Sequence, residues 1–290
     1  MKNSQTIAIL GIGLIGGSLA LGIKQRTQGQ ISILGSCSDA KRALLAQKKG
    51  IIDEIIHDTK QLQKADLIIL ATPIPETLIL LKDLSGQKLK KNVLVLDVAS
   101  VKCVIEETIT LINPDFHFIG THPMAGGEKK GFENADPNLF HNKPWIVTPM
   151  NRNSKNDMLF INKIIKKLGG IPKVLPAKLH DEQVAWASHL PLTLSSLIVR
   201  TLEENSDWNS VKKLVSTGFR DVTRLASHDP IFKTEVILNN KHNLLKSLNK
   251  LKEEIRYFEQ LVNLSGKKEL YDYFAKAKDI RDGLFNSPIN

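Results

Sequence analysis

The sequence predicts an α/β protein in which a doubly wound, mostly parallel sheet is followed by an all-helical domain. Short apolar runs alternate with helical patterns up to about residue 177, which is typical of a parallel sheet with helices on both faces. Beyond residue 178 the strand patterns end, and the apolar residues recur at helical spacing. We therefore expect a sheet domain over residues 1–177 and a helical domain over residues 178–290.

The expected strands are short apolar segments of the first domain. Leu67–Leu70 and Val93–Leu96 are continuously apolar, as strands covered on both faces should be. The full set of expected strands is Thr6–Leu10, Ile31–Ser36, Asp66–Ala71, Asn92–Val98, His117–Gly120, Trp145–Thr148 and Pro172–Leu175. The expected helices are Leu14–Arg26, Ala40–Lys49, Glu76–Leu84, Lys102–Ile112 and Lys155–Leu168.

The helical domain is predicted from long stretches with few helix-breaking residues. These stretches are Asp181–Leu202, Ser210–Val215, Ile231–Val262 and Lys267–Leu284. Ile231–Val262 is predicted as one helix of ~9 turns, longer than a small domain needs for itself. Because helices of that length often pack against a second subunit, we expect a homodimer.

The composition is that of an ordinary globular chain, with 42% hydrophobic and 24% charged residues among 290. The apolar run Ile7–Ile23 is interrupted by glycines and is short for a bilayer span, so we expect a cytoplasmic protein with no membrane contact. Two cysteines, Cys37 and Cys103, fit a reducing compartment. The net charge of +10 comes from scattered lysines rather than a basic stripe with interleaved aromatics, so we expect no nucleic-acid partner.

A glycine-rich turn joins the first strand to the first helix. Gly11 permits the tight turn, Gly13 lets the backbone approach a pyrophosphate, and Gly16 lets the helix pack on the strand. The unpaired N–H groups at the start of the helix would bind the phosphates. This is the pattern of a Rossmann-type dinucleotide-binding domain, with cofactor contacts expected from Gly11, Gly13, Leu14, Ile15 and Gly16.

The end of the second strand bears on the choice of cofactor. Cys37 and Ser38 stand where an NAD-binding domain carries an acidic residue for the ribose hydroxyls. Small polar residues there, with Lys41 and Arg42 nearby, would accept a 2′-phosphate, so we expect NADP. Alternatively Asp39 binds the ribose and the cofactor is NAD, although Asp39 is also well placed to cap the next helix. The remaining expected cofactor contacts are Ser36, Thr72, Pro73 and Asp97.

Several further segments concentrate unusual polar residues. Asp97-Val-Ala-Ser100-Val-Lys102 and Gly120-Thr121-His122-Pro123-Met124-Ala125-Gly126-Gly127 each follow or end a predicted strand, where doubly wound sheets bind ligands. The helical domain adds Trp186-Ala-Ser188-His189-Leu190-Pro191 and Gly218-Phe219-Arg220-Asp221-Val222-Thr223-Arg224. From residue 6 to about residue 240, these motifs in this order resemble the prephenate/arogenate dehydrogenase family of tyrosine biosynthesis.

The resemblance implies oxidative decarboxylation of a cyclohexadienol. Hydride leaves ring carbon C4 for the nicotinamide, the C4 hydroxyl gives up its proton, and the C1 carboxylate leaves as carbon dioxide. By the resemblance, His122 is the base and Ser100 shares its hydrogen-bond network. Arg224 would hold a substrate carboxylate. The other substrate contacts implied are His189, Ser188 and Thr121, and no metal is expected.

Some of these residues also have purely structural interpretations. Ser100 could cap the helix that follows it, and His122 or His189 could be a histidine of the core. Lys102 is expected to support the site from behind or to be a surface charge, and not to act in the chemistry.

Two positions bear on the substrate. Arg220 and Arg224 both lie near Asp221, so one of them could make only an ion pair, and the family's Thr-Arg pattern assigns the substrate carboxylate to Arg224. Some prephenate-using members carry a second histidine directly after Ser-His-Leu-Pro, where this chain has Leu192. The resemblance and the NADP-type strand end together predict an NADP-dependent arogenate dehydrogenase. A prephenate dehydrogenase that uses NAD or NADP is the alternative.

Two other classes of protein also use such a glycine turn. A dehydrogenase of 3-hydroxy acids would use a lysine at the start of the helical domain, where this chain has Lys178, but the motifs around His122 and His189 would then be unexplained. A sensor without catalytic activity would bind NADP and turn nothing over.

Overall fold

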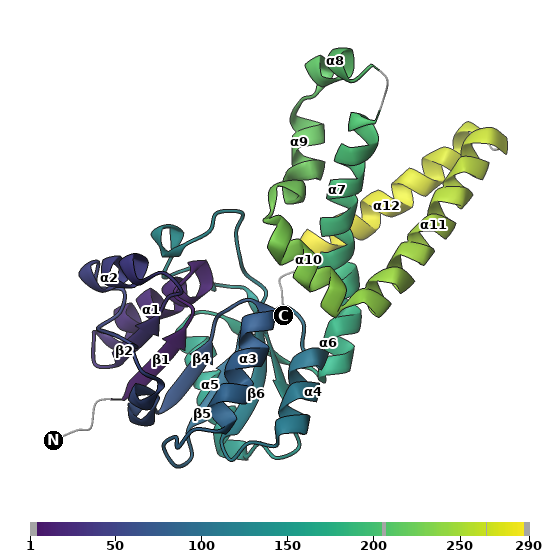
Figure 1. The fold of residues 1–290 in the computed structure, drawn as a ribbon. Helices are drawn as coiled ribbons and strands as arrows, with labels where there is room; N and C mark the ends of the chain where they lie inside the picture. Colours follow the sequence, from purple (N-terminus) through teal and green to yellow (C-terminus); the bar gives the residue numbers. More distant parts are fainter. Residues whose placement is uncertain (1–4, 205–206, 265, 287–290) are drawn as a thin grey trace. The chain divides into compact units, whose positions relative to one another are not determined.

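The computed structural model of the protein describes residues 5–204, 207–264 and 266–286. The chain divides into two compact units after Lys241. The first unit contains the sheet and helices α1 to α10, and the second contains helices α11 and α12 (Figure 1). Helices α6 to α10 thus share a compact unit with the sheet, and the division at residues 177/178 stays a prediction.

Eight strands form one sheet in the first unit, in the order β3-β2-β1-β4-β5-β6-β7-β8. The chain starts at β1, inside the sheet, and winds first to one edge and then to the other. All described neighbours are parallel except β6 and β7, which confirms the predicted doubly wound, mostly parallel sheet. The strands are β1 (Thr6–Leu10), β2 (Ser32–Ser36), β3 (Glu54–Ile55), β4 (Leu67–Leu70), β5 (Leu94–Asp97), β6 (His117–Pro123), β7 (Pro144–Pro149) and β8 (Ile171–Val174).

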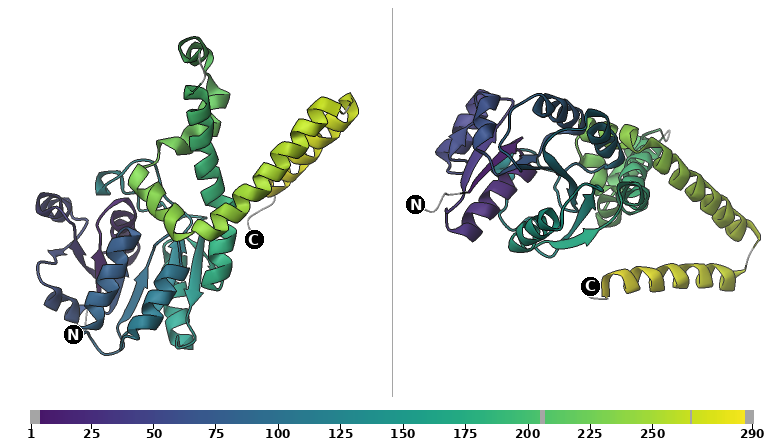
Figure 2. Two further views of the ribbon diagram at one scale, coloured as in Figure 1. Left: turned by 45° about the vertical axis from the view of Figure 1, so that its right-hand side comes forward. Right: turned by 90° about the horizontal axis from the view of Figure 1, so that it is seen from below.

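Helices cover both faces of the sheet and enclose a separate apolar core on each (Figure 2). Ile7 and Ile9 of β1 belong to one core, and Ala8 and Leu10 belong to the other, as the alternation of a strand requires. This two-sided burial explains the continuously apolar strands. The first core takes side chains from α1 (Leu14–Thr27), α2 (Ala40–Lys48) and α5 (Lys155–Lys167), and the second from α3 (Ile74–Ser85) and α4 (Cys103–Ile112).

A π-helical turn, Ala185–His189, joins α6 (Ala177–Val184) to α7 (Leu190–Glu203). Pro191 explains the turn, because proline lacks an N–H group and its ring clashes with the carbonyl four residues earlier. The turn matters because it carries the Ser-His motif. Three further helices follow in this unit, α8 (Trp208–Val211), α9 (Thr217–Thr223) and α10 (Pro230–Asn239).

The single helix expected over Ile231–Val262 is wrong. The chain forms α10 and a separate α11 (Lys241–Leu264), with a break at Asn240. Asn240 has φ −123° and ψ 29°, and its buried side-chain amide donates a hydrogen bond to the carbonyl oxygen of Asp181 at 2.8 Å. A buried polar contact therefore overrides an apolar periodicity that continues across the break.

The second unit is a pair of helices, α11 and α12 (Lys267–Asn286), held by aromatic contacts. Tyr273 of α12 packs against Tyr257 and Phe258 of α11, with ring centroids 6.2 and 5.4 Å apart, and its hydroxyl donates to Glu254. Other large apolar side chains of these helices, including Ile280, are exposed.

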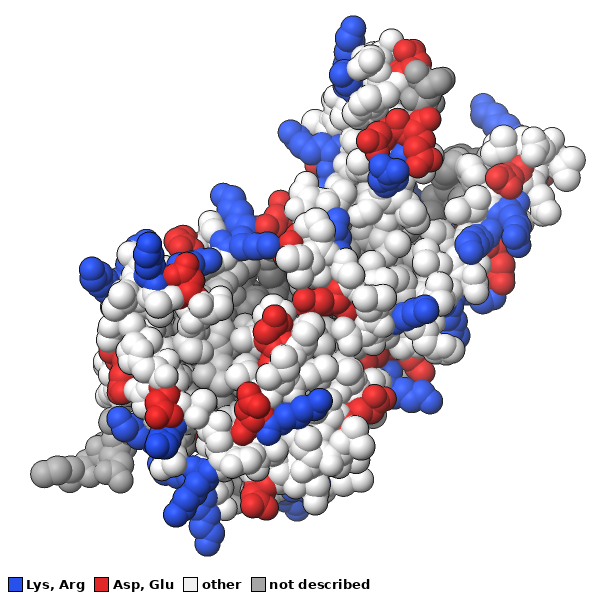
Figure 3. Space-filling model, in the orientation of Figure 1, with Lys and Arg blue, Asp and Glu red and all other residues white. Residues whose placement is uncertain are grey.

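Charged side chains of both signs are interspersed over the face drawn in Figure 3, in keeping with lysines scattered along the chain. Among the described residues, none of the helices has the length and apolar character needed to cross a membrane.

Candidate active site

A pocket of ≈ 290 Å³ in the first unit lies beyond the carboxyl end of β5 and beside the end of β6. Loops after these strands form one wall, and helices α7 and α10 with the segment around Arg224 form the other. The pocket brings together five residues that the sequence assigned to catalysis or to the substrate, namely Ser100, His122, Ser188, His189 and Arg224.

His122 lies on the pocket wall and is buried, with 9% of the residue exposed. Its Nδ1 lies 2.9 Å from Nε2 of His180, and the two rings meet edge to face. Burial lowers the pKa of His122 well below its usual value of 6.5, and His180, Lys102 and His189 lower it further. His122 is therefore neutral at physiological pH, which is the form that can accept a proton.

Asp181 is a buried carboxylate that connects His180 to the start of α4. Its carboxylate accepts a hydrogen bond from Nδ1 of His180 at 2.7 Å and from the backbone N–H groups of Lys102 and Cys103 at 2.8 Å each. Burial alone would raise the pKa of Asp181, but these hydrogen bonds outweigh it and lower the pKa. Because Asp181 caps α4, the structural interpretation of Ser100 as the cap of that helix is wrong.

The same carboxylate acts on Cys103. Burial and the neighbouring Asp181 raise the pKa of the Cys103 thiol to about 12, so it stays protonated.

His189 lies in the π-helical turn and is 1% exposed. The amide nitrogen of Asn240 donates to Nδ1 of His189 at 3.1 Å and to the backbone carbonyl of Asp181 at 2.8 Å. Nδ1 is then the acceptor, so the ring proton is on Nε2, which has no hydrogen-bond partner in the described part of the chain. Burial lowers the pKa of His189 to about 4. His189 thus lines the pocket as a neutral imidazole whose Nε2–H is buried.

Lys102 and Asp97 form an ion pair in the core, with side chains 1% and 0% exposed. The ammonium group also donates to the carbonyl of Thr121, and the Thr121 hydroxyl donates to the carbonyl of Asp97. Burial lowers the pKa of Lys102, against the opposing effect of Asp97. Lys102 is therefore not a surface charge. Asp97 and Thr121, predicted as cofactor and substrate contacts, are enclosed behind the pocket and do not line it.

The structure separates the two arginines. Arg220 faces Asp221 at 3.9 Å on the surface, whereas Arg224 lines the pocket and pairs with Glu128. Glu128 belongs to the loop of residues 124–143 between β6 and β7. Lys178, expected to be catalytic in a dehydrogenase of 3-hydroxy acids, is exposed on α6 and is not part of the pocket lining.

The glycine turn after β1 has the shape that a pyrophosphate needs. A Cβ on Gly11 would lie 2.5 Å from the carbonyl oxygen of Ala71, at a φ of +101°, and one on Gly16 would lie 2.1 Å from the carbonyl oxygen of Gly11. At Gly13, the N-cap of α1, a Cβ would meet nothing within 4 Å. The backbone is therefore open beside a helix N-terminus whose first turn holds no acidic residue, and these residues fit a dinucleotide.

The other predicted cofactor contacts surround this turn. Asp39 caps α2, because its Oδ1 accepts from the backbone N–H groups of Lys41 at 2.8 Å and Arg42 at 3.3 Å. This agrees with the interpretation of Asp39 as a helix cap. Arg42 pairs with Glu133 of the 124–143 loop at 2.9 Å and stacks on Phe132. The remaining contacts are Ser36, whose carbonyl accepts from the turn, half-buried Cys37, exposed Ser38, Thr72 bonded to Thr77, and Pro73 at the start of α3.

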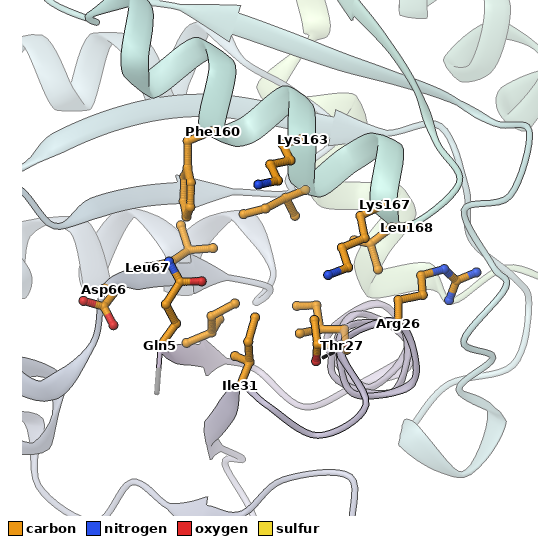
Figure 4. A pocket seen from close by; sticks show the side chains of 13 residues that line it. Gln5, Arg26, Thr27, Ile31, Asp66, Leu67, Phe160, Lys163, Lys167 and Leu168 are labelled. Carbon is orange, nitrogen blue, oxygen red and sulfur yellow. Dashed lines mark hydrogen bonds between the residues drawn. The ribbon is translucent and has the colours of Figure 1, made fainter. Parts of the chain in front are cut away.

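A second pocket, of ≈ 220 Å³, lies at the amino ends of the strands, whereas the first lies at their carboxyl ends. Figure 4 shows the side chains that line it. It opens beside the start of β1 and β4, is mainly apolar, and carries Lys163 and Lys167 of α5 at its rim. It contains no imidazole, so the chemistry described above belongs to the first pocket. Within residues 5–204, 207–264 and 266–286, no group of three histidine, cysteine or acidic residues is placed to hold a metal ion.

Sequence reasoning missed His180, Asp181, Asn240 and His228. His228 lies on the pocket wall, and burial lowers its pKa. A signal for the first two was present, because His180 and Asp181 lie on the same helical face as Ala177 and Val184, which are also buried. Ionisable residues on an apolar helix face need a polar partner in the core.

A doubly wound sheet with an open glycine turn, joined to a pocket with a neutral buried imidazole, defines a nucleotide-dependent enzyme of the Rossmann type. Residues 19–173 match the sequence model of the prephenate dehydrogenase nucleotide-binding domain, and residues 176–276 match that of the prephenate dehydrogenase dimerization domain. The chain belongs to the prephenate/arogenate dehydrogenase family, which confirms the resemblance seen in the motifs.

Relatives and solved structures agree with this assignment. The chain is 35% identical to the prephenate dehydrogenase of Lactococcus lactis subsp. cremoris, over 96% of this chain and 77% of that protein. It is similar to the crystal structure of Synechocystis arogenate dehydrogenase, with a TM-score of 0.83 and 30% identity over 97% of this chain and 100% of that one. A prephenate dehydrogenase of A. aeolicus, in complex with hydroxyphenyl propionate and NAD+, gives a TM-score of 0.89 and 28% identity over 97% and 98% of the two chains.

Proposed function

We propose that this enzyme converts arogenate to tyrosine by oxidative decarboxylation, with hydride transfer to NADP. The observation that carries the proposal is the neutral, buried imidazole of His122 on the wall of a pocket that also contains Ser100, His189 and Arg224. A base that is neutral near pH 7 suits removal of a hydroxyl proton.

Each of these residues has a distinct task. The nicotinamide, when bound, supplies the acceptor for the hydride that leaves C4 of the ring. His122 accepts the proton of the C4 hydroxyl, a step that general bases typically accelerate by about 10²–10⁴-fold. Ser100 shares the hydrogen-bond network of that hydroxyl. Arg224 holds a carboxylate of the substrate, and the Nε2–H of His189 donates a further hydrogen bond. Departure of the C1 carboxylate as carbon dioxide makes the ring aromatic, and the phenol oxygen regains the proton.

The preference for arogenate is supported by Leu192. Its side chain is apolar and lines the pocket, at the position where some prephenate-using members carry a second histidine. His228 favours the second candidate, prephenate, because it provides another imidazole on the same pocket wall. Two curated relatives named prephenate dehydrogenase point the same way.

The preference for NADP is supported by Asp39. One oxygen of its carboxylate is used in capping α2, and the exposed side chains beside it are Ser38 and Lys41, which do not repel a 2′-phosphate. The alternative, NAD, is supported by the A. aeolicus structure, which was solved with NAD+.

A homodimer is the proposed assembly, formed through the helical domain. The exposed apolar side chains of α11 and α12 need a partner to leave water, and the matching family model is described as a dimerization domain.

The test is a set of initial rates with arogenate or prephenate, each with NADP or NAD. Highest kcat/KM with arogenate and NADP is the expected result. Turnover mainly of prephenate with NAD would overturn both preferences, and no turnover in any of the four combinations would overturn the activity. His122→Ala, as the control, should bind NADP with unchanged affinity and lose turnover.

A further inference from the structure

A chain of hydrogen bonds leads from the pocket into the interior through three ionisable side chains. Nδ1 of His122 contacts Nε2 of His180 at 2.9 Å, and Nδ1 of His180 contacts Oδ1 of Asp181 at 2.7 Å. His180 is 0% exposed and Asp181 is 1% exposed, so both side chains are shielded from solvent. The three groups come from β6 and α6, which lie far apart in the sequence.

The direction of each hydrogen bond follows from Asp181. Both of its oxygens accept backbone N–H groups, from Lys102 and Cys103, so the carboxylate acts only as an acceptor. Nδ1 of His180 must then carry a proton, and in the neutral ring its Nε2 is the acceptor. Nδ1 of His122 donates to that nitrogen, which leaves the lone pair of His122 on Nε2.

We propose that His180 and Asp181 are positioning residues that hold His122 in the tautomer with an open Nε2, the nitrogen that accepts the proton of the substrate hydroxyl. This role rests on the proposed dehydrogenase function. When the O–H bond of the substrate breaks, its proton forms the Nε2–H bond of His122, while Nδ1–H of His122 still points at Nε2 of His180 and Nδ1–H of His180 at Asp181. The proton returns to the phenol oxygen after decarboxylation, so no external acid or base is required.

Other charged groups near the two imidazoles do not take this role. Lys102 is a cation that acts on His122, but its ammonium group is paired with Asp97. The Cys103 thiol is protonated, and His189 is held in the opposite tautomer by Asn240. At the pocket wall Arg224 is paired with Glu128. Asp181 is therefore the carboxylate in hydrogen-bonded connection with His122.

The test compares two substitutions of His180. His180→Gln keeps a side-chain oxygen that can accept from Nδ1 of His122, whereas His180→Leu removes every acceptor. His117→Gln is the matched control. His117 lies on β6, as His122 does, and its Nδ1 contacts Asp157 at 3.1 Å, but it does not line the pocket. Asp181 itself is unsuitable, since its loss would also uncap α4.

We expect His180→Leu to lower kcat by about 10²-fold, with KM and the Kd for NADP changed less than about twofold. His180→Gln should recover about tenfold of that loss, and His117→Gln should leave kcat unchanged. Nitrogen-15 NMR of His122 should show a protonated Nδ1 in the wild type and a mixture of tautomers in His180→Leu. A structural role alone would change thermal stability without this tautomer shift.

A kcat for His180→Leu within twofold of the wild type would overturn the proposal. So would a wild-type spectrum in which Nε2 of His122 carries the proton. If His180→Leu fails to fold, the wild-type spectrum and the kcat of His180→Gln decide. Wild-type protein that turns over neither substrate would refute the proposed function, while the NMR spectrum would still report whether the tautomer is held.

Discussion

Replacing Lys102 with methionine should leave Asp97 as an unpaired charge in the core. The two side chains are 1% and 0% exposed, and the ammonium group of Lys102 contacts both Asp97 and the carbonyl of Thr121. Methionine fills a similar volume, and its backbone N–H can still donate to the carboxylate of Asp181. The change is therefore electrostatic and creates little new cavity.

The magnitude follows from what remains around Asp97. Removing one partner of a buried ion pair costs about 3–5 kcal/mol of unfolding free energy. The backbone N–H groups of Ala99 and Thr121 still donate to the carboxylate, at 2.9 and 3.3 Å, so we expect about 3–4 kcal/mol. The double variant Lys102→Met/Asp97→Asn removes the uncompensated charge and should recover at least about 1 kcal/mol.

Urea unfolding followed by tryptophan fluorescence, at one protein concentration, measures these differences. Lys90→Met is the control, because Lys90 pairs with Asp66 at the surface, where the side chains are 47% and 29% exposed. Its loss should cost less than about 1 kcal/mol. Equal losses in Lys102→Met and Lys90→Met would refute the argument that the interior pair matters because it is buried.

Three further predictions concern the substrate, the cofactor and pH. Leu192→His should raise kcat/KM for prephenate relative to arogenate, because it adds a donor to the pocket; an unchanged ratio of initial rates would remove that argument. Glu133→Gln should lower the KM for NADP about fivefold and spare that for NAD, since it removes an anion worth about 1 kcal/mol beside Arg42; equal changes in both KM values would contradict it. The pKa of His189 is about 4 in the folded protein and about 6.5 in the unfolded chain, so the unfolded chain binds more protons between these values. The free energy of unfolding is therefore highest above pH 6.5 and falls as the pH drops toward 4. The loss should be about 2 kcal/mol at pH 5, and His189→Gln should show a shallower decline in urea unfolding; parallel curves would rule this out.

The sheet could be predicted closely because local sequence determines it. β1 begins and ends at the predicted residues, since its burial on both faces requires an unbroken apolar run up to Gly11. β3 was missed because two residues, Glu54 and Ile55, are too few to show periodicity. The break at Asn240 could not be predicted, because its cause is a hydrogen bond to Asp181, which is distant in sequence.

The pocket shows the same division between local and distant causes. Ser100 and His122 follow or end strands of the sheet, so their arrival at one edge could be anticipated. The partner of His122 could not, because His180 reaches it from another element. The π-helical turn that carries His189 also depends on how Pro191 is accommodated, which apolar spacing does not reveal.

The loop of residues 124–143 contacts two arginines, one beside the glycine turn and one in the pocket. Glu133 of this loop holds Arg42 beside the expected nucleotide, and Glu128 holds Arg224 in the pocket. A ligand that draws either arginine away acts on the same short stretch of backbone. If the nucleotide contacts Arg42 and the substrate contacts Arg224, as proposed, we expect the two free energies of binding to be linked, so that each ligand changes the affinity for the other by an equal factor.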